Sequence, residues 1–278
     1  MPGDKLRFRF AKTGTLRLLS HHDLMRCLER MLRRADVPFK STAGFHPTPR
    51  VVFALSLPLG VVGLDEVVEI EFTRPLDEAE TLATLRSQAP AGLEFTRVSV
   101  VPIRATAVPR RVVYRLELPG ERADGVAEKC RELMGQDKVW VDRLRPGPKR
   151  LNIRPYFRNL SVESVSRDTQ RSASAPLRVA ATQLVLDLWV TQTGTARADE
   201  ILRLLDITDL TDAGAVVERT TVELHDEVPN PDPADGPPTG PAETLPLDPA
   251  AIAALVREDE EQSAAAAWGP SPAGPVVE

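Results

Sequence analysis

Three histidines and two cations in the first fifty residues are of the types that hold or cleave a phosphodiester. His21 and His22 open a predicted helix, where the positive end of the helix dipole lowers a histidine pKa and favours the neutral ring that a general base needs. His46 lies in a loop that neighbouring prolines stiffen. If that loop folded over the helix start, His21 and His46 would surround one phosphate together with Lys12 and Arg50, an arrangement that suits general acid–base cleavage of RNA.

The spacing of these residues does not demand catalysis. A histidine at a helix terminus is more often hydrogen-bonded or exposed, and no carboxylate or cysteine is spaced to complete a metal site around these rings. The chain has no Walker loop, GxGxxG, GxSxG or HExxH, which removes the usual support for nucleotide, dinucleotide, esterase and zinc-protease chemistry. Cys27 and Cys130 lie on separate predicted helices, where we expect buried small apolar residues, and no iron–sulfur ligand set is present. We therefore expect no metal and no cofactor in this chain.

The elements that would position these residues begin with a capped helix. Ser20 and Asp23 have capping-box spacing. Apolar residues then follow at helical spacing, which predicts a buried stripe: Leu24, Cys27, Leu28, Met31, Leu32 and Ala35. The opposite face is cationic and carries Arg26, Arg30, Arg33 and Arg34. Residues 1–50 contain eleven Lys/Arg against four Asp/Glu, so this helix lies in a strongly basic region.

Strands and a second helix surround the cationic helix. Residues 5–10 alternate charged and apolar side chains, which predicts a strand, and residues 15–19 resume strand character. Further strands are predicted at 51–59, 66–72 and 93–101, with a helix at 77–89. The order βαββαβ is typical of a split βαβ, or ferredoxin-like, domain, in which two helices cover one face of an antiparallel sheet.

The same order can be drawn a second time. Strand patterns are found at 112–118, 138–144, 150–164, 178–191 and 216–224, and helical patterns at 123–135 and 197–206. We therefore expect an α+β protein with two tandem ferredoxin-like domains, residues 1–106 and 107–225, the second with an irregular basic insert. The repeat is one of pattern and not of sequence identity.

Residues 226–278 differ in composition from the rest. They hold eleven Asp/Glu, one Lys/Arg and eleven of the 25 prolines, whereas residues 1–225 hold 34 basic and 29 acidic residues. Such a segment buries too little apolar surface to offset ordering entropy, which predicts a disordered acidic, proline-rich tail. Residues 249–261 form an amphipathic island, either a helix that docks on a partner or on its own domain, or a transient helix.

A second basic stretch lies between residues 143 and 178 and encloses Tyr156 and Phe157. Basic residues interleaved with aromatic rings are what single-stranded RNA binding uses, because guanidinium groups track phosphates while rings stack on bases. The alternatives are an acidic protein partner and a plainly solvated surface. No run of about 18 apolar residues is present and the start has no apolar signal segment, so we expect no membrane association and a cytoplasmic chain.

The stretch FRFAKTGTLRLLSHHDLMRCLERMLRRADVPFKSTAGFHPTPRVVFALSLPLGV closely resembles the N-terminal signature of the radical-SAM-linked protein family, and the resemblance extends over about residues 5–225. The matching positions are Lys12, Gly14, Ser20, His21, Asp23, Arg26, Gly44, Phe45, Pro47, Pro49, Arg50 and Gly60, with a weaker match at Ile153, Arg154, Pro155 and Tyr156. The chain departs at His22, where the family usually has Leu, and at His46 and Thr48, where it often has Asn and His.

This resemblance implies a companion of a radical SAM protein that works on RNA, either tRNA or rRNA. The expected function is a non-catalytic RNA-binding or adaptor subunit. The candidate contacts with RNA or partner are Lys12, Arg17, Ser20, His21, Arg26, Arg30, Arg33, Gly44, Phe45, His46, Arg50, Arg154, Tyr156 and Arg158. The paired ferredoxin-like layout is also similar to CRISPR-type endonucleases, so the alternative is a metal-independent RNA endonuclease that uses His21. The sequence predicts no oligomeric state.

Overall fold

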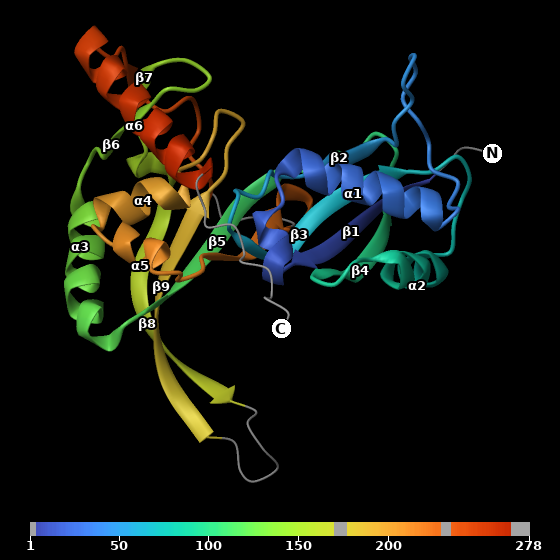
Figure 1. Ribbon diagram of the computed structural model, residues 1–278, viewed down its shortest axis with the longest axis horizontal. Coiled ribbons are helices and arrows are strands. Elements are labelled where there is room, and N and C mark those ends of the chain that lie inside the picture. The colour runs from blue at the N-terminus through green and yellow to red at the C-terminus, as the bar shows by residue number, and fades with distance from the viewer. Residues whose placement is uncertain (1–3, 170–176, 229–234, 268–278) are drawn as a thin grey trace, which may run out of the picture.

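The computed structural model describes residues 4–169, 177–228 and 235–267 (Figure 1). These residues form an α+β protein with six α-helices and a large mixed sheet. The sheet has eight strands in the order β4-β1-β3-β10-β5-β9-β8, with β2 beside β3. It runs from one half of the chain into the other without a break.

The first half contributes the β4 side of this sheet. Its elements are β1 (Lys5–Lys12), α1 (His21–Arg34), β2 (Val51–Phe53), β3 (Val62–Glu71), α2 (Glu78–Gln88) and β4 (Leu93–Val101). β1 pairs antiparallel with both β3 and β4. Leu6, Phe8 and Phe10 alternate along β1 and share one core with the apolar side of α1 and with Leu85 of α2. The period-two pattern of residues 5–10 is therefore confirmed. The helical stripe of α1 is confirmed at Leu24, Leu28, Met31 and Leu32, whereas the expectation that Cys27 is buried is wrong, because it is half-buried.

Two expected strands are shorter or absent. Residues 15–19 were expected to be a strand, but Gly14–Leu18 form the 3-10 helix η1, which begins at Gly14 with φ +58°. The predicted strand 51–59 stops at Phe53. Beyond it the chain leaves the sheet, and the carbonyls of Leu55 and Ser56 accept hydrogen bonds from Arg219 instead. A buried side chain distant in sequence therefore decided where this strand ends.

The second half supplies the remaining strands. Its elements are β5 (Pro109–Leu118), α3 (Ala123–Gly135), β6 (Trp140–Arg143), β7 (Lys149–Asn152), β8 (Phe157–Thr169), β9 (Leu177–Trp189), α4 (Ala198–Leu204), α5 (Thr208–Asp212) and β10 (Glu218–Leu224). Their order in the sheet is β10-β5-β9-β8, and α3 and α4 share a core with these strands. β8 and β9 extend as a long hairpin away from the body (Figure 1). The basic insert contains β6 and β7, which form a separate small sheet.

A buried ion pair marks the place where the halves join. β3 and β10 pair in parallel through Val62 with Glu218 and Gly63 with Arg219. The Arg219 side chain is 1% exposed, and its Nε donates to the Glu66 carboxylate at 2.8 Å. The guanidinium also lies 5.9 Å from the centre of the Tyr114 ring of β5. One charged group therefore contacts strands of both halves.

Replacing Glu66 with glutamine should destabilise the whole sheet. Glu66→Gln keeps the shape of the side chain but leaves the Arg219 charge uncompensated, and breaking a buried pair costs about 3–5 kcal/mol of unfolding free energy. Urea unfolding would measure the loss. The control is Asp209→Asn, which removes one partner of the exposed Arg122–Asp209 pair and should leave stability nearly unchanged. Equal stabilities of the two variants would contradict this role for Glu66.

Part of the predicted disordered tail has a defined place. Asp226 and Glu227 pair with arginines of β1, and Asp235 pairs with Arg158. The segment then adds the short strand β11 (Thr244–Leu245) to β7 and continues as helix α6 (Pro249–Ala267). The ion pairs between these carboxylates and the arginines explain why a segment with little apolar surface is held here. Residues 229–234 and 268–278 of the predicted tail lie outside the described residues.

Candidate nucleic-acid interface

Helix α1 begins at the cap that the sequence predicts. The backbone N–H of Asp23 donates to Ser20 Oγ at 3.2 Å, and the Ser20 hydroxyl donates to the Asp23 carboxylate at 2.7 Å. That hydroxyl lowers the pKa of Asp23, and Arg26 adds to the effect. The Lys12 ammonium donates to the carbonyl of Leu19 at 2.7 Å. The end of β1 therefore fixes the start of the helix, and Ser20 acts as a cap.

The outer side of α1, here called the cationic face, consists of Arg26, Arg30, Arg33 and Arg34. All four side chains are exposed. Arg33 pairs with Glu29 at 2.8 Å and Arg26 with Asp23 at 3.3 Å, both within one turn of the helix. Arg30 makes no hydrogen bond or ion pair with any residue that the structure describes. Such exposed pairs are weak, so these guanidinium groups are available to an anion.

A projecting loop, residues 40–50, lies beyond the end of α1 (Figure 1). Its two arms are paired: the Arg50 N–H donates to the Lys40 carbonyl at 2.8 Å, and the Thr42 N–H donates to the Thr48 carbonyl at 2.8 Å. Gly44 has φ +142°, a conformation that favours glycine and reverses the chain at the tip. Phe45 follows, and its side chain is fully exposed. The loop thus presents an aromatic ring to solvent on a hydrogen-bonded stem.

Arg33 connects the cationic face to this loop. Its guanidinium carbon lies 5.6 Å from the centre of the Phe39 ring, and its Nη2 donates to the Pro47 carbonyl at 3.5 Å. At the base of the loop, Lys40 and Arg50 share the Glu71 carboxylate at 3.2 and 3.4 Å. The cations of α1 and those of the loop therefore belong to one surface, and Arg26, Arg30, Arg33, Gly44, Phe45, His46 and Arg50 are all exposed on it.

Arg17 lies apart from that surface. It belongs to η1, where its Nη1 donates to the Gly14 carbonyl at 3.2 Å. With Leu18 and Leu59, both exposed, it lines a cavity of about 320 Å³ at the seam between the halves, whose opposite wall comes from α4 and the α5–β10 connection. Arg17 therefore faces a mainly apolar pocket and not the cationic face.

The four residues proposed to surround one phosphate are not brought together. Lys12 is 1% exposed, so its ammonium is closed to an outside ligand. Arg50 pairs with Glu71, and His46 lies on the projecting loop. His21 is half-buried, with its ring centre 5.0 Å from that of Phe53. The expectation failed because the prolines stiffen the loop in an outward direction, where pairing between its arms holds it.

His21 nevertheless has an altered acidity. Burial, and then the nearby charges of His22 and Lys12, lower its pKa below the ordinary value of 6.5. The folded protein therefore keeps this ring neutral at pH values where the unfolded chain begins to protonate it. The stability that this supplies is present above the unfolded pKa and is lost as the pH falls through the folded one.

A His21→Gln variant tests this linkage. Between about pH 7.5 and about pH 5, the wild type should lose more unfolding free energy than the variant, because only the wild type must protonate a half-buried imidazole. Urea unfolding at both pH values measures the difference. A ring titration by NMR, assigned through the variant, should give a midpoint below 6.5. A midpoint at or above that value would refute the predicted shift.

Two candidate RNA contacts of the second basic stretch, Arg154 and Tyr156, make contacts within the protein that stabilise its fold. Arg154 donates from Nη2 to the Met134 carbonyl at 2.7 Å and from Nε to the Gln136 carbonyl at 3.0 Å, which closes the C-terminal end of α3. Tyr156 is 1% exposed and packs within the core of the second half. Its ring is therefore inaccessible for stacking on a base. The side chains of Arg167, Arg171 and Arg178 lie outside the described ones.

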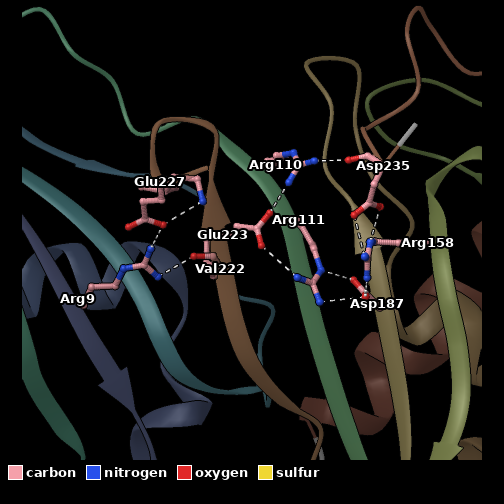
Figure 2. A network of polar contacts seen from close by, with 10 residues as sticks. Arg9, Arg110, Arg111, Arg158, Asp187, Val222, Glu223, Glu227 and Asp235 are labelled. Carbon is pink, nitrogen blue, oxygen red and sulfur yellow. Dashed lines mark hydrogen bonds and ion pairs between the residues drawn. The ribbon is translucent and has the colours of Figure 1, made fainter. Parts of the chain in front are cut away.

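Arg158 belongs to a network of arginines and carboxylates (Figure 2). Its Nη1 donates to Asp187 at 2.6 Å, and its Nε donates to Asp235 at 2.9 Å. Arg110 and Arg158 also lie near the Trp189 ring, 4.9 and 5.5 Å from its centre. Neither Arg110 nor Trp189 is predicted from the sequence, because two adjacent arginines at the start of one strand and a tryptophan at the end of another carry no local signal that they meet.

Two further properties concern ligands and membranes. Residues 4–169, 177–228 and 235–267 contain no group of three or more His, Cys, Asp or Glu that could hold a metal ion. Cys130 is buried, and burial raises the pKa of its thiol to about 11, whereas Cys27 is only half-buried. No helix in the described parts of the chain has the length and apolar character needed to cross a membrane.

One family of known proteins matches most of the first 200 residues. The model of a family described as "Uncharacterized protein conserved in bacteria (DUF2344)" matches residues 5–196. No curated protein matches the chain. The family description names no radical SAM protein, so the association with one remains a prediction.

Proposed function

The chain belongs to the bacterial family DUF2344, and we propose that it is a non-catalytic RNA-binding or adaptor subunit. The RNA would lie along the cationic face of α1 and the projecting loop. The observation that carries this proposal is the fully exposed Phe45 at the tip of a loop that Arg33 of the cationic face contacts through the Pro47 carbonyl. The partner we propose is a radical SAM enzyme acting on tRNA or rRNA, and the sequence resemblance alone supports that part.

An exposed phenylalanine at a loop tip needs a reason, because its ring gains nothing from burial in this fold. Stacking of an unpaired base on such a ring contributes about 1–3 kcal/mol and tolerates any base. The hydrogen-bonded stem between Lys40 and Arg50 reduces the entropy that the loop would lose on binding. Both properties support the proposal that an unpaired base stacks on Phe45.

The cations beside Phe45 suit the phosphates of the same strand. Arg30 has no partner among the described residues, and the carboxylates that pair with Arg26 and Arg33 are themselves partly exposed to solvent. Phosphates can replace such carboxylates at little cost, because an exposed pair contributes little and the arginine keeps a charge-assisted hydrogen bond.

The strand orders support the interpretation of two tandem ferredoxin-like units. The strand order of the first half is β4-β1-β3-β2, and that of the second half is β10-β5-β9-β8. With β6 and β7 left out, each order places the fourth strand of its half beside the first, then the third and then the second. Each half also has the sequence order βαββαβ once β6, β7 and α5 are set aside as additions. Fold alone does not assign an activity.

Phe45→Ala should weaken binding of a single-stranded RNA by about 5-fold to about 100-fold, the equivalent of one lost stacking contact. Arg30→Gln should weaken it less but lower the slope of log affinity against log salt by about 0.7. Fluorescence anisotropy with labelled oligouridine at several salt concentrations measures both. Arg131→Gln, at an exposed arginine of α3, is the matched control. If Phe45→Ala and Arg131→Gln bind equally well, Phe45 is not a stacking platform.

The alternative function, a metal-independent RNA endonuclease, rests on the lowered pKa of His21, which favours a neutral base. The nearest described histidine ring is that of His22, 6.1 Å away between centres. Labelled RNA incubated with the protein in EDTA distinguishes the two functions. A retarded band without cleavage supports the adaptor, and specific cuts that His21→Gln abolishes support the nuclease.

A further inference from the structure

The strands carry a second set of cations, on the side turned away from α1 and α2. Lys5, Arg7 and Arg9 alternate along β1 with the residues that pack on those helices. Arg111 precedes Val112, which lies in the core with α3. Together with Arg110 and Arg158 these residues form a row across β1, β5 and β8, which Figure 2 shows in part. We call the five arginines of this row the strand arginines.

Each arginine of this row has a partner within the sheet. Arg7 donates to Glu69 at 2.9 Å, Arg9 to Asp65 at 2.6 Å, Arg110 to Glu223 at 2.8 Å, and Arg111 and Arg158 to Asp187, each at 2.6 Å. Arg9 also donates to the Val222 carbonyl at 2.6 Å. Each guanidinium group therefore has at least one partner in the sheet itself.

A second layer of carboxylates lies over the row. Asp226 contacts Arg7 at 2.8 Å, Glu227 contacts Arg9, and Asp235 contacts Arg158 at 2.9 Å. The backbone carbonyl of Asp235 also accepts from Arg110. These three acids, here called the acidic cover, come from the chain after β10, beyond the part that matches the family.

Each carboxylate of the cover is more exposed than the arginine that it contacts. The side chains of Asp226, Glu227 and Asp235 are 51%, 34% and 48% exposed, whereas those of Arg7, Arg9 and Arg158 are 7%, 5% and 32% exposed. The guanidinium groups thus face outward onto carboxylates that are themselves in contact with solvent. A phosphate would take the same charge-assisted hydrogen bonds from the same direction.

The charges of the row depend on this cover. Six cations, Lys5 and the five strand arginines, face four carboxylates of the sheet: Asp65, Glu69, Asp187 and Glu223. The sheet layer alone therefore carries a net positive charge, and the three acids of the cover turn it negative. Arg110 and Arg158 against Trp189 add an aromatic ring to this cationic layer.

We propose that the strand arginines form a second binding surface for single-stranded RNA and that Asp226, Glu227 and Asp235 occupy it in competition with the phosphates. This rests on the proposed function, because it assumes that the chain binds RNA. RNA would bind first at the cationic face of α1. The strand arginines would bind phosphates only when the three carboxylates of the acidic cover separate from them. The cover thereby limits how much RNA the protein holds.

The test is a full-length Asp226→Asn/Glu227→Gln/Asp235→Asn variant, which keeps the side-chain shapes and leaves each arginine its partner in the sheet. With labelled oligouridine as the probe, we expect about tenfold tighter binding at low salt and a salt slope steeper by about 2. The matched control is Glu128→Gln/Asp199→Asn/Asp209→Asn, which removes three exposed carboxylates that also pair with arginines elsewhere. It changes the net charge equally and should gain much less affinity.

Arg111→Gln/Arg158→Gln, added to the cover variant, should abolish its gain in affinity. If the cover variant and the control variant bind oligouridine with equal affinity, the second surface does not exist, whatever the affinity of the wild type. If they bind equally while Phe45→Ala still weakens binding, only this inference fails. If neither the wild type nor the cover variant binds oligouridine, the proposed function fails with it. Circular dichroism of each variant verifies that it remains folded.

Discussion

The ion pair between Arg219 and Glu66 is the interaction on which the remaining structure depends most. It sits where β10 of the second half meets β3 of the first, and it draws the carbonyls of Leu55 and Ser56 away from the sheet. The same carboxylate opposes the fall in the pKa of buried Lys12, which burial causes and Arg219 increases. Because the Lys12 ammonium holds the Leu19 carbonyl, the start of α1 and the direction of its cationic face follow from a charge pair at the seam.

Arginine serves two purposes in this protein. On α1 it is exposed, with at most one carboxylate beside it, and it leaves most of its donors to solvent or ligand. On β1 it is almost enclosed and carries two layers of partners, as Arg7 does with Glu69 and Asp226. The planar, multiply donating guanidinium makes this second use possible, because one side chain can satisfy two carboxylates in fixed directions.

Much of the fold could be predicted, because its signals are local. The cap at Ser20, the apolar stripe of α1 and the alternation of residues 5–10 each indicate an element directly. The shortened β2 could not be predicted, because Arg219 stands far away in the sequence and ends it through backbone carbonyls. The site was predicted only in part. The exposure of Arg26, Arg30 and Arg33 follows from the periodicity of an amphipathic helix, so the sequence predicts it. The burial of Tyr156 and Lys12 depends on tertiary packing, which the sequence pattern does not show.

The join between β3 and β10 also has a consequence for synthesis. Glu66 and Arg219 stand 153 positions apart in the chain. Translation runs from the N-terminus, so the first half emerges long before its partner strand exists, with an ionised Glu66 and part of one β3 edge facing water. A nascent chain at that stage has an open strand edge beside a carboxylate that discourages wrong pairing. The carboxylate that pairs with Arg219 in the finished protein therefore also limits wrong strand pairing in the interval before β10 is synthesised.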